Sequence, residues 1–90
     1  MKKRLEAKVY GIVQGVGFRF YIHYYAKSLG IVGYIKNNID GTVSFVGEGE
    51  EENLKKILEH LYRGPTGAVV SNVEYNFSDA KGEFKNFVIK

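Results

Sequence analysis

The chain has 90 residues, of which 44% are hydrophobic and 14% aromatic, and its formal net charge is +3. This composition excludes a disordered chain, and the length suffices for one small core but not for two, so we expect one domain over residues 1–90. Cysteine is absent, which excludes disulfides, thiolate nucleophiles and cysteine-bound metals. The net charge is too weak to argue for nucleic acid, and no apolar stretch reaches membrane-spanning length. We therefore expect a soluble, cytoplasmic protein.

The first half of the chain predicts a strand, a helix and a hairpin. Apolar residues alternate over Leu5–Val13, which is typical of a strand. An apolar stripe at helical spacing predicts a helix next, formed by Phe18, Ile22, Tyr25, Ala26 and Leu29. Gly30 is placed to end this helix. Two further strands, Ile31–Lys36 and Thr42–Val46, flank the turn Asn37–Gly41, in which Asp-Gly is a strong hairpin signal.

The second half predicts one more helix and two strands. The helix covers about Glu50–Tyr62, and its apolar stripe consists of Leu54, Ile57, Leu58 and Leu61. Alternating apolar residues predict a strand over Val69–Phe77, and a turn separates it from a last strand, Phe84–Ile89. The order β-α-β-β-α-β with an extra terminal strand indicates an α+β, ferredoxin-like fold. In this fold an antiparallel sheet carries both helices on one face, and here a short extra strand follows at the C-terminal side.

The loop Gln14–Arg19 contains the most informative anomaly of the sequence. No Ser, Thr, Asp or Asn is placed to cap the helix that follows, and Arg19 puts a permanent cation at the positive end of the helix dipole. The second predicted helix, by contrast, has acidic residues at its start and basic residues at its end. An external anion would explain the anomaly, because Gly15 and Gly17 allow the backbone to turn its N–H groups toward it. The alternative is a tight turn that leaves Arg19 exposed to solvent.

For the other polar residues, a structural role accounts for the sequence at least as well as a catalytic or ligand-binding role. Asn37 and Asn38 end a strand, where spacing alone favours turn residues, although an amide near the glycine loop could hold a water molecule. His23 and His60 have no carboxylate at ligand spacing, so a solvated helix face is favoured over a metal site or a phosphohistidine. The run Glu48–Glu52 is interpreted as the acidic start of a helix rather than as acid–base carboxylates.

RNA binding is a second class of function to consider. RNA-recognition domains share this order of elements and stack bases on aromatic residues of the sheet. The segment from Asp40 to Val46 is faintly similar to their central strand, but it lacks the leading basic residue and the stacking aromatics. The sequence therefore favours a protein without nucleic-acid or membrane partners. It leaves the oligomeric state open, with a monomer as the expectation.

Two motifs resemble the signatures of the acylphosphatase family. The first covers Gly11–Arg19 and reads GIVQGVGFR. The second begins with Gly33–Asn37, which reads GYIKN, and continues with Gly41–Val43 and Gly49. The motifs keep the order and separation found in that family, and with the predicted topology the resemblance covers essentially the whole chain.

The resemblance implies a cofactor-free and metal-independent hydrolase that converts acyl phosphates to a carboxylate and inorganic phosphate. Carried over by motif, Arg19 binds the phosphoryl group together with the backbone N–H groups of Gly15, Val16, Gly17, Phe18 and Arg19. Asn37 is then the residue that orients the attacking water. Because the leaving group is a carboxylate, no general acid is demanded, and we hypothesise that a phosphate oxygen of the substrate accepts the water's proton. The competing interpretation is a non-catalytic module that keeps the phosphate cradle, since related domains occur inside larger maturation proteins.

Overall fold

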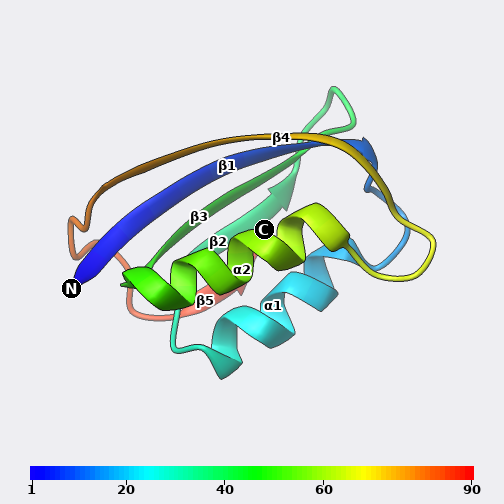
Figure 1. Cartoon of the computed structure of the whole chain (residues 1–90). Coiled ribbons are helices and arrows are strands. Elements are labelled where there is room, and N and C mark those ends of the chain that lie inside the picture. Colours follow the sequence, from blue (N-terminus) through cyan, green and yellow to red (C-terminus); the bar gives the residue numbers. More distant parts are fainter.

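The computed structural model describes residues 1–90, which form five strands and two helices (Figure 1). In chain order these are β1 (Lys2–Ile12), α1 (Phe18–Ser28), β2 (Val32–Asn37), β3 (Val43–Glu50), α2 (Glu51–Arg63), β4 (Val69–Asp79) and β5 (Phe87–Ile89). Every element predicted from the sequence is present, with its ends shifted by a few residues. No helix is both long and apolar enough to cross a membrane.

The strands form one sheet in the order β4-β1-β3-β2-β5. β1 pairs antiparallel with β3 and β4, and β2 pairs antiparallel with β3 as the predicted hairpin. β5 differs, because it lies parallel to β2 at the edge of the sheet. The reason is the direction of the chain: β2 runs the same way as β1, β4 runs the opposite way, and the chain reverses again after β4. β1, β2 and β5 therefore all end at the same end of the sheet.

Both helices cover one face of the sheet and leave the other face open (Figure 1). The predicted apolar stripes are buried there, through Phe18, Ile22, Ala26, Leu54, Ile57 and Leu61. They pack against strand residues on the same face, among them Leu5, Val9, Ile35, Val43, Phe45 and Phe87. This burial of apolar side chains is the main contribution to the stability of the fold.

The two helices begin in opposite ways. α2 has Glu51 and Glu52 in its first turn and His60 and Arg63 in its last turn, which suits the helix dipole. Its first N–H donates to the carbonyl of Met1 at 3.1 Å, although no side chain caps it. α1 has no acidic residue in its first turn and no side-chain cap. The contrast expected from the sequence is therefore present, except that α2 is capped by a backbone carbonyl.

Glu48 does not belong to the start of α2, which corrects the sequence interpretation of the acidic run. β3 extends to Glu50, and the carboxylate of Glu48 is buried in the sheet, with 4% of the residue exposed. It accepts hydrogen bonds from Arg4 Nε (2.9 Å) and from the N–H groups of Lys81 (2.9 Å) and Gly82 (3.0 Å). Burial alone raises the pKa of this carboxyl, but the hydrogen bonds outweigh it and the pKa lies below its usual value. The carboxylate thus holds the connection between β4 and β5 against the sheet.

We expect Glu48→Gln to lower the free energy of unfolding by about 2 kcal/mol at neutral pH, because Arg4 loses a buried, charged acceptor. The folded-state pKa of Glu48 is lowered, so its contribution is complete above the unfolded pKa of about 4.3. The contribution is lost as the pH falls through the lower, folded-state pKa. Urea unfolding of parent and variant at a series of pH values measures both effects.

Glu83→Gln is the matched control for this prediction. Glu83 accepts from the same arginine at 2.6 Å, but its side chain is 56% exposed. Exposed ion pairs contribute at most about 1 kcal/mol, so this variant should lose less stability. Equal losses of unfolding free energy in the two variants would show that the buried Glu48 contributes no more stability than the exposed Glu83.

Candidate active site

The loop between β1 and α1 lies at the end of the sheet where β2 and β5 also end (Figure 1). The sequence alone left open whether this loop is close to the asparagines at the end of β2. The strand order decides the question, because β1 and β2 run in the same direction on either side of β3. The two predicted motifs are therefore brought together by the topology of the sheet.

Gln14 ties the glycine loop to the turn between β2 and β3. Its Nε2 donates to the carbonyl oxygens of Asn38 (2.8 Å) and Thr42 (3.0 Å). Inside the turn, Asn38 Nδ2 donates to Thr42 Oγ1 and to Ser44 Oγ. The hydroxyl and N–H of Thr42 both donate to Asp40 Oδ1, which lowers the pKa of Asp40 to about 2. No role for Gln14 can be predicted from the sequence, since nothing in its local pattern distinguishes a tether from a surface glutamine.

The loop carries backbone N–H groups that the protein itself does not use. Gly15 and Gly17 have φ angles of 75° and 77°, in the left-handed region that favours glycine, and Gly17 is the N-cap of α1. From Gly15 to Arg19, the N–H groups have no acceptor in the backbone or in a side chain. Unpaired donors at the positive end of a helix dipole favour a bound anion.

Arg19 lies in the first turn of α1, where the sequence placed it. Its Nη1 donates to the main-chain oxygen of Lys90, just beyond β5, at 2.8 Å. A guanidinium has five N–H donors in a planar fork, so this bond leaves most of them for a ligand. The contact holds Arg19 toward the end of the sheet at which the loop and β2 meet.

Asn37 Oδ1 is the one buried side-chain polar atom without a hydrogen-bond partner. Asn37 is the last residue of β2 and pairs with Val43 across the ladder. A buried acceptor without a partner costs about 1–3 kcal/mol, so its presence needs a reason. Asn38, in contrast, uses its amide within the turn. The structure thus separates two asparagines that the sequence could not distinguish.

Neither histidine lies on a fully solvated helix face, in contrast to the sequence expectation. His60 stacks on Tyr25 at 3.8 Å, and its Nδ1 lies 2.9 Å from the Tyr21 hydroxyl. Burial, with Arg63 nearby, lowers the pKa of His60. His23 is half-buried, with its ring 6.0 Å from that of Phe87. No group of three or more His, Cys, Asp or Glu side chains in the chain could hold a metal ion.

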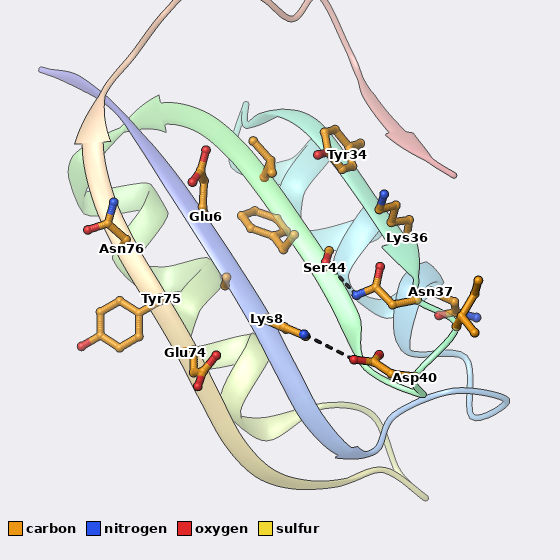
Figure 2. A pocket seen from close by; sticks show the side chains of 15 residues that line it. Glu6, Lys8, Tyr34, Lys36, Asn37, Asp40, Ser44, Glu74, Tyr75 and Asn76 are labelled. Atoms are coloured by element: carbon orange, nitrogen blue, oxygen red, sulfur yellow. Dashed lines mark hydrogen bonds and ion pairs between the residues drawn. The ribbon is translucent and has the colours of Figure 1, made fainter.

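A broad concavity of about 1080 Å³ lies on the open face of the sheet (Figure 2). Glutamates as well as lysines line it, and Lys8 pairs with Asp40 at 3.3 Å. Tyr34 is an aromatic residue of this face, but Phe84 packs against its ring at 6.0 Å and the Lys90 ammonium lies 4.1 Å from the ring centre. A surface of mixed charge is unlike the basic grooves that bind single strands, so the geometry gives no support to RNA binding.

The fold and the site define a ferredoxin-like α+β protein in which a glycine loop and an arginine begin an uncapped helix. A family model described as Acylphosphatase matches residues 5–89. An acylphosphatase from Caldanaerobacter subterraneus subsp. tengcongensis is 43% identical over 89 residues, covering 99% of each protein. The crystal structure of an acylphosphatase from Bacillus subtilis is similar with a TM-score of 0.94 and 30% identity, covering 98% of each chain. A structure of full-length HypF in a phosphate- and nucleotide-bound form is similar with a TM-score of 0.88 and 27% identity, over all of this chain and 12% of that one.

The chain belongs to the acylphosphatase family. This confirms the resemblance of the two sequence motifs and the ferredoxin-like fold. Family membership makes the protein a hydrolase and supports small-molecule acyl phosphates as its substrates.

Proposed function

We propose that this protein hydrolyses acyl phosphates at the loop between β1 and α1, with Asn37 and Arg19 as catalytic residues. In this proposal the N–H groups of Gly15, Val16, Gly17, Phe18 and Arg19 bind the phosphoryl oxygens. The Arg19 guanidinium binds two of these oxygens at once, which a planar fork does better than an ammonium. Asn37 orients the attacking water. Residues 1–90 would form one catalytic domain.

The unpartnered oxygen of Asn37 is the observation that carries the proposal. A site that only bound the unprotonated oxygens of a phosphoryl group would need donors, because each of these oxygens is an acceptor. Asn37 Oδ1 is itself an acceptor, so it suits the O–H group of a water molecule rather than a phosphate oxygen. A donor cradle beside a lone acceptor thus favours hydrolysis over the alternative of a non-catalytic phosphate-binding module.

The reaction then needs few groups. The water oxygen held by Asn37 attacks phosphorus in line with the bond to the acyl oxygen, and that bond breaks with its electron pair leaving on the carboxylate. The water's proton passes to a phosphate oxygen of the substrate, so the products are a carboxylate and inorganic phosphate. Arg19 and the loop N–H groups stabilise the charge on the transferring phosphoryl group, and because they are fixed before the reaction they need not reorganise during it.

Hydrolysis of benzoyl phosphate in the presence of EDTA tests this proposal directly. The activity should persist with EDTA, since no group of three or more His, Cys, Asp or Glu side chains in this chain could hold a metal ion. A protein that bound inorganic phosphate but did not turn over benzoyl phosphate would support the non-catalytic module instead. Salt-dependent retention on single-stranded RNA would favour the RNA-binding alternative. The monomeric state and cytoplasmic location expected from the sequence stay predictions.

We expect Gln14→Ala to lower kcat by about tenfold, because a glutamine that tethers the loop fixes the distance between phosphate and water. Affinity for inorganic phosphate should change less, since the loop N–H groups remain. Asn53→Ala is the matched control: its amide tethers α2 to the carbonyl of Leu29 at 3.2 Å, away from the loop. If both variants lost activity equally, the tether of Gln14 would have no particular role in positioning.

A further inference from the structure

The glycine loop between β1 and α1 has a neighbouring segment on each side. On one side is the hairpin of β2 and β3, because Gln14 binds its turn and Asn37 ends its first strand. On the other side is the segment that joins α2 to β4, residues 64–68, which we call the α2–β4 connection. The strand order β4-β1-β3-β2 puts the hairpin and the start of β4 on opposite sides of the end of β1. The loop therefore begins between the hairpin and the connection (Figure 1).

The α2–β4 connection packs against the part of the loop that carries the proposed phosphate donors. A Cβ atom at position 67 would lie 4.0 Å from Val16 Cγ1, and a Cβ atom at position 64 would lie 3.0 Å from the ring of Phe18. Given a hydrogen bond of about 2.9 Å and ordinary bond lengths, a phosphoryl oxygen held by the N–H of Val16 lies within about 11 Å of position 67. An aromatic acyl group extends about 6 Å from phosphorus, so it can cover most of that distance.

The proposed reaction directs the acyl group of a bound substrate toward this connection. Asn37 is proposed to hold the attacking water, and it belongs to the hairpin side of the loop. Attack on phosphorus is roughly in line, so the acyl oxygen leaves on the side opposite to the water. That side is the side of the α2–β4 connection. The inference rests on the proposed function, because the proposed function places the phosphate in the loop and the water at Asn37.

The connection and the strand ends beside it are apolar and uncharged. Residues 64–68 read GPTGA, with no charged and no large side chain. Ile12, the last residue of β1, pairs with Val69, the first residue of β4. These residues are 60% and 57% exposed, and in no other ladder pair of the sheet are both partners exposed large hydrophobic residues. We call Ile12 and Val69 the apolar pair. Apolar side chains that lie together in water favour a bound group that covers them.

We propose that the apolar pair and the α2–β4 connection form the subsite for the acyl group of the substrate, and that this subsite takes an apolar acyl group. The small residues of the connection leave room for the group, and the side chains of Ile12 and Val69 supply apolar surface against it. Removing apolar surface from water on both partners favours binding. This contact is present before the reaction as well as during it, so it should act on KM and kcat/KM more than on kcat.

The first test compares benzoyl phosphate with acetyl phosphate, which differ only in the acyl group. In the parent, kcat/KM should be about tenfold higher for benzoyl phosphate, because only its ring reaches the apolar pair. In the double variant Ile12→Thr, Val69→Thr this preference should fall to about threefold, mainly through a higher KM for benzoyl phosphate. Threonine keeps the β-branched shape that suits a strand, so the midpoint of urea unfolding should stay close to that of the parent.

The double variant Ile39→Thr, Val88→Thr is the matched control, because it makes the same two changes on the hairpin side of the loop. Ile39 is fully exposed in the turn between β2 and β3, and Val88 is 43% exposed on β5, which pairs with β2. Its preference for benzoyl phosphate should match that of the parent. A loss of preference in the control, with none in Ile12→Thr, Val69→Thr, would place the acyl group on the hairpin side and overturn the proposal.

A charge placed on the connection gives a second, independent readout. Thr66 is exposed in the middle of the connection, so Thr66→Lys adds an ammonium there without burying it. At low ionic strength this variant should raise kcat/KM for 4-carboxybenzoyl phosphate relative to benzoyl phosphate by about threefold, and high salt should remove the gain. Ser28→Lys adds the same charge at the other end of α1 and should show no gain.

The outcomes separate the subsite from the proposed function. A parent that hydrolyses benzoyl and acetyl phosphate with equal kcat/KM would overturn the acyl subsite and leave the proposed function intact. Equal gains in Thr66→Lys and Ser28→Lys would also overturn the subsite, since only net charge would then matter. Failure of the parent to hydrolyse either substrate would instead overturn the proposed function and the inference with it.

Discussion

Arg19→Ala should lower kcat/KM for benzoyl phosphate by about 10³-fold or more while leaving the protein at least nearly as stable as the parent. The loss in rate follows because the guanidinium is the only side-chain cation in the first turn of α1, where the phosphoryl group would lie. The stability is expected to hold because a cation at the positive end of a helix costs about 0.3–1 kcal/mol. Removing it offsets the lost hydrogen bond to the Lys90 carbonyl.

Arg19→Lys separates the charge of this residue from its shape. A lysine keeps the charge but cannot bind two phosphoryl oxygens at fixed angles, so most of the activity should remain lost. Arg63→Ala, at the end of α2, is the control for the removal of an arginine from a helix terminus and should retain activity. Steady-state kinetics, phosphate binding by calorimetry and urea unfolding give the three readouts. Parent-like turnover in Arg19→Lys would show that a charge alone suffices and that the bidentate contact is not needed.

The glycine loop was predictable because its signals are local. A missing cap, two glycines and a misplaced arginine can be read along the chain, since helix capping and the helix dipole act within one turn. The apolar stripes of both helices and the alternation of the strands were predictable for the same reason. They depend on the period of 3.6 residues in a helix and 2 residues in a strand. These periods place the apolar side chains on the face that is buried in the folded protein.

Other features depend on which segments meet in space, and the sequence does not encode this in any short pattern. Glu48 looked like part of an acidic helix start because nothing nearby reveals its partners, which lie on β1 and beyond β4. Gln14 and Asn38 meet across the sheet end, and only the strand order brings them together. The parallel pairing of β5 likewise follows from the path of the whole chain rather than from its own residues.

Asn37→Ala should lower kcat by about 10²-fold or more and leave the affinity for inorganic phosphate nearly unchanged. The amide oxygen is proposed to position the attacking water, and loss of a positioned catalytic hydrogen bond has an effect of this size. The phosphate donors lie on the loop, so the variant should still bind the product. Stability should be kept or gained, because the change removes a buried acceptor without a partner, whose burial costs about 1–3 kcal/mol.

Asn38→Ala is the matched control, because it removes the same amide one residue further along the chain. Asn38 donates to Thr42 and Ser44 within the turn, so its loss should lower the free energy of unfolding by about 1–2 kcal/mol. The two asparagines are thus expected to show opposite signatures: activity is lost with stability kept in one, and stability is lost with most activity kept in the other. Turnover of Asn37→Ala at the parent rate would rule out its role in orienting water. A loss of stability in Asn37→Ala would show instead that its oxygen has a structural partner in solution.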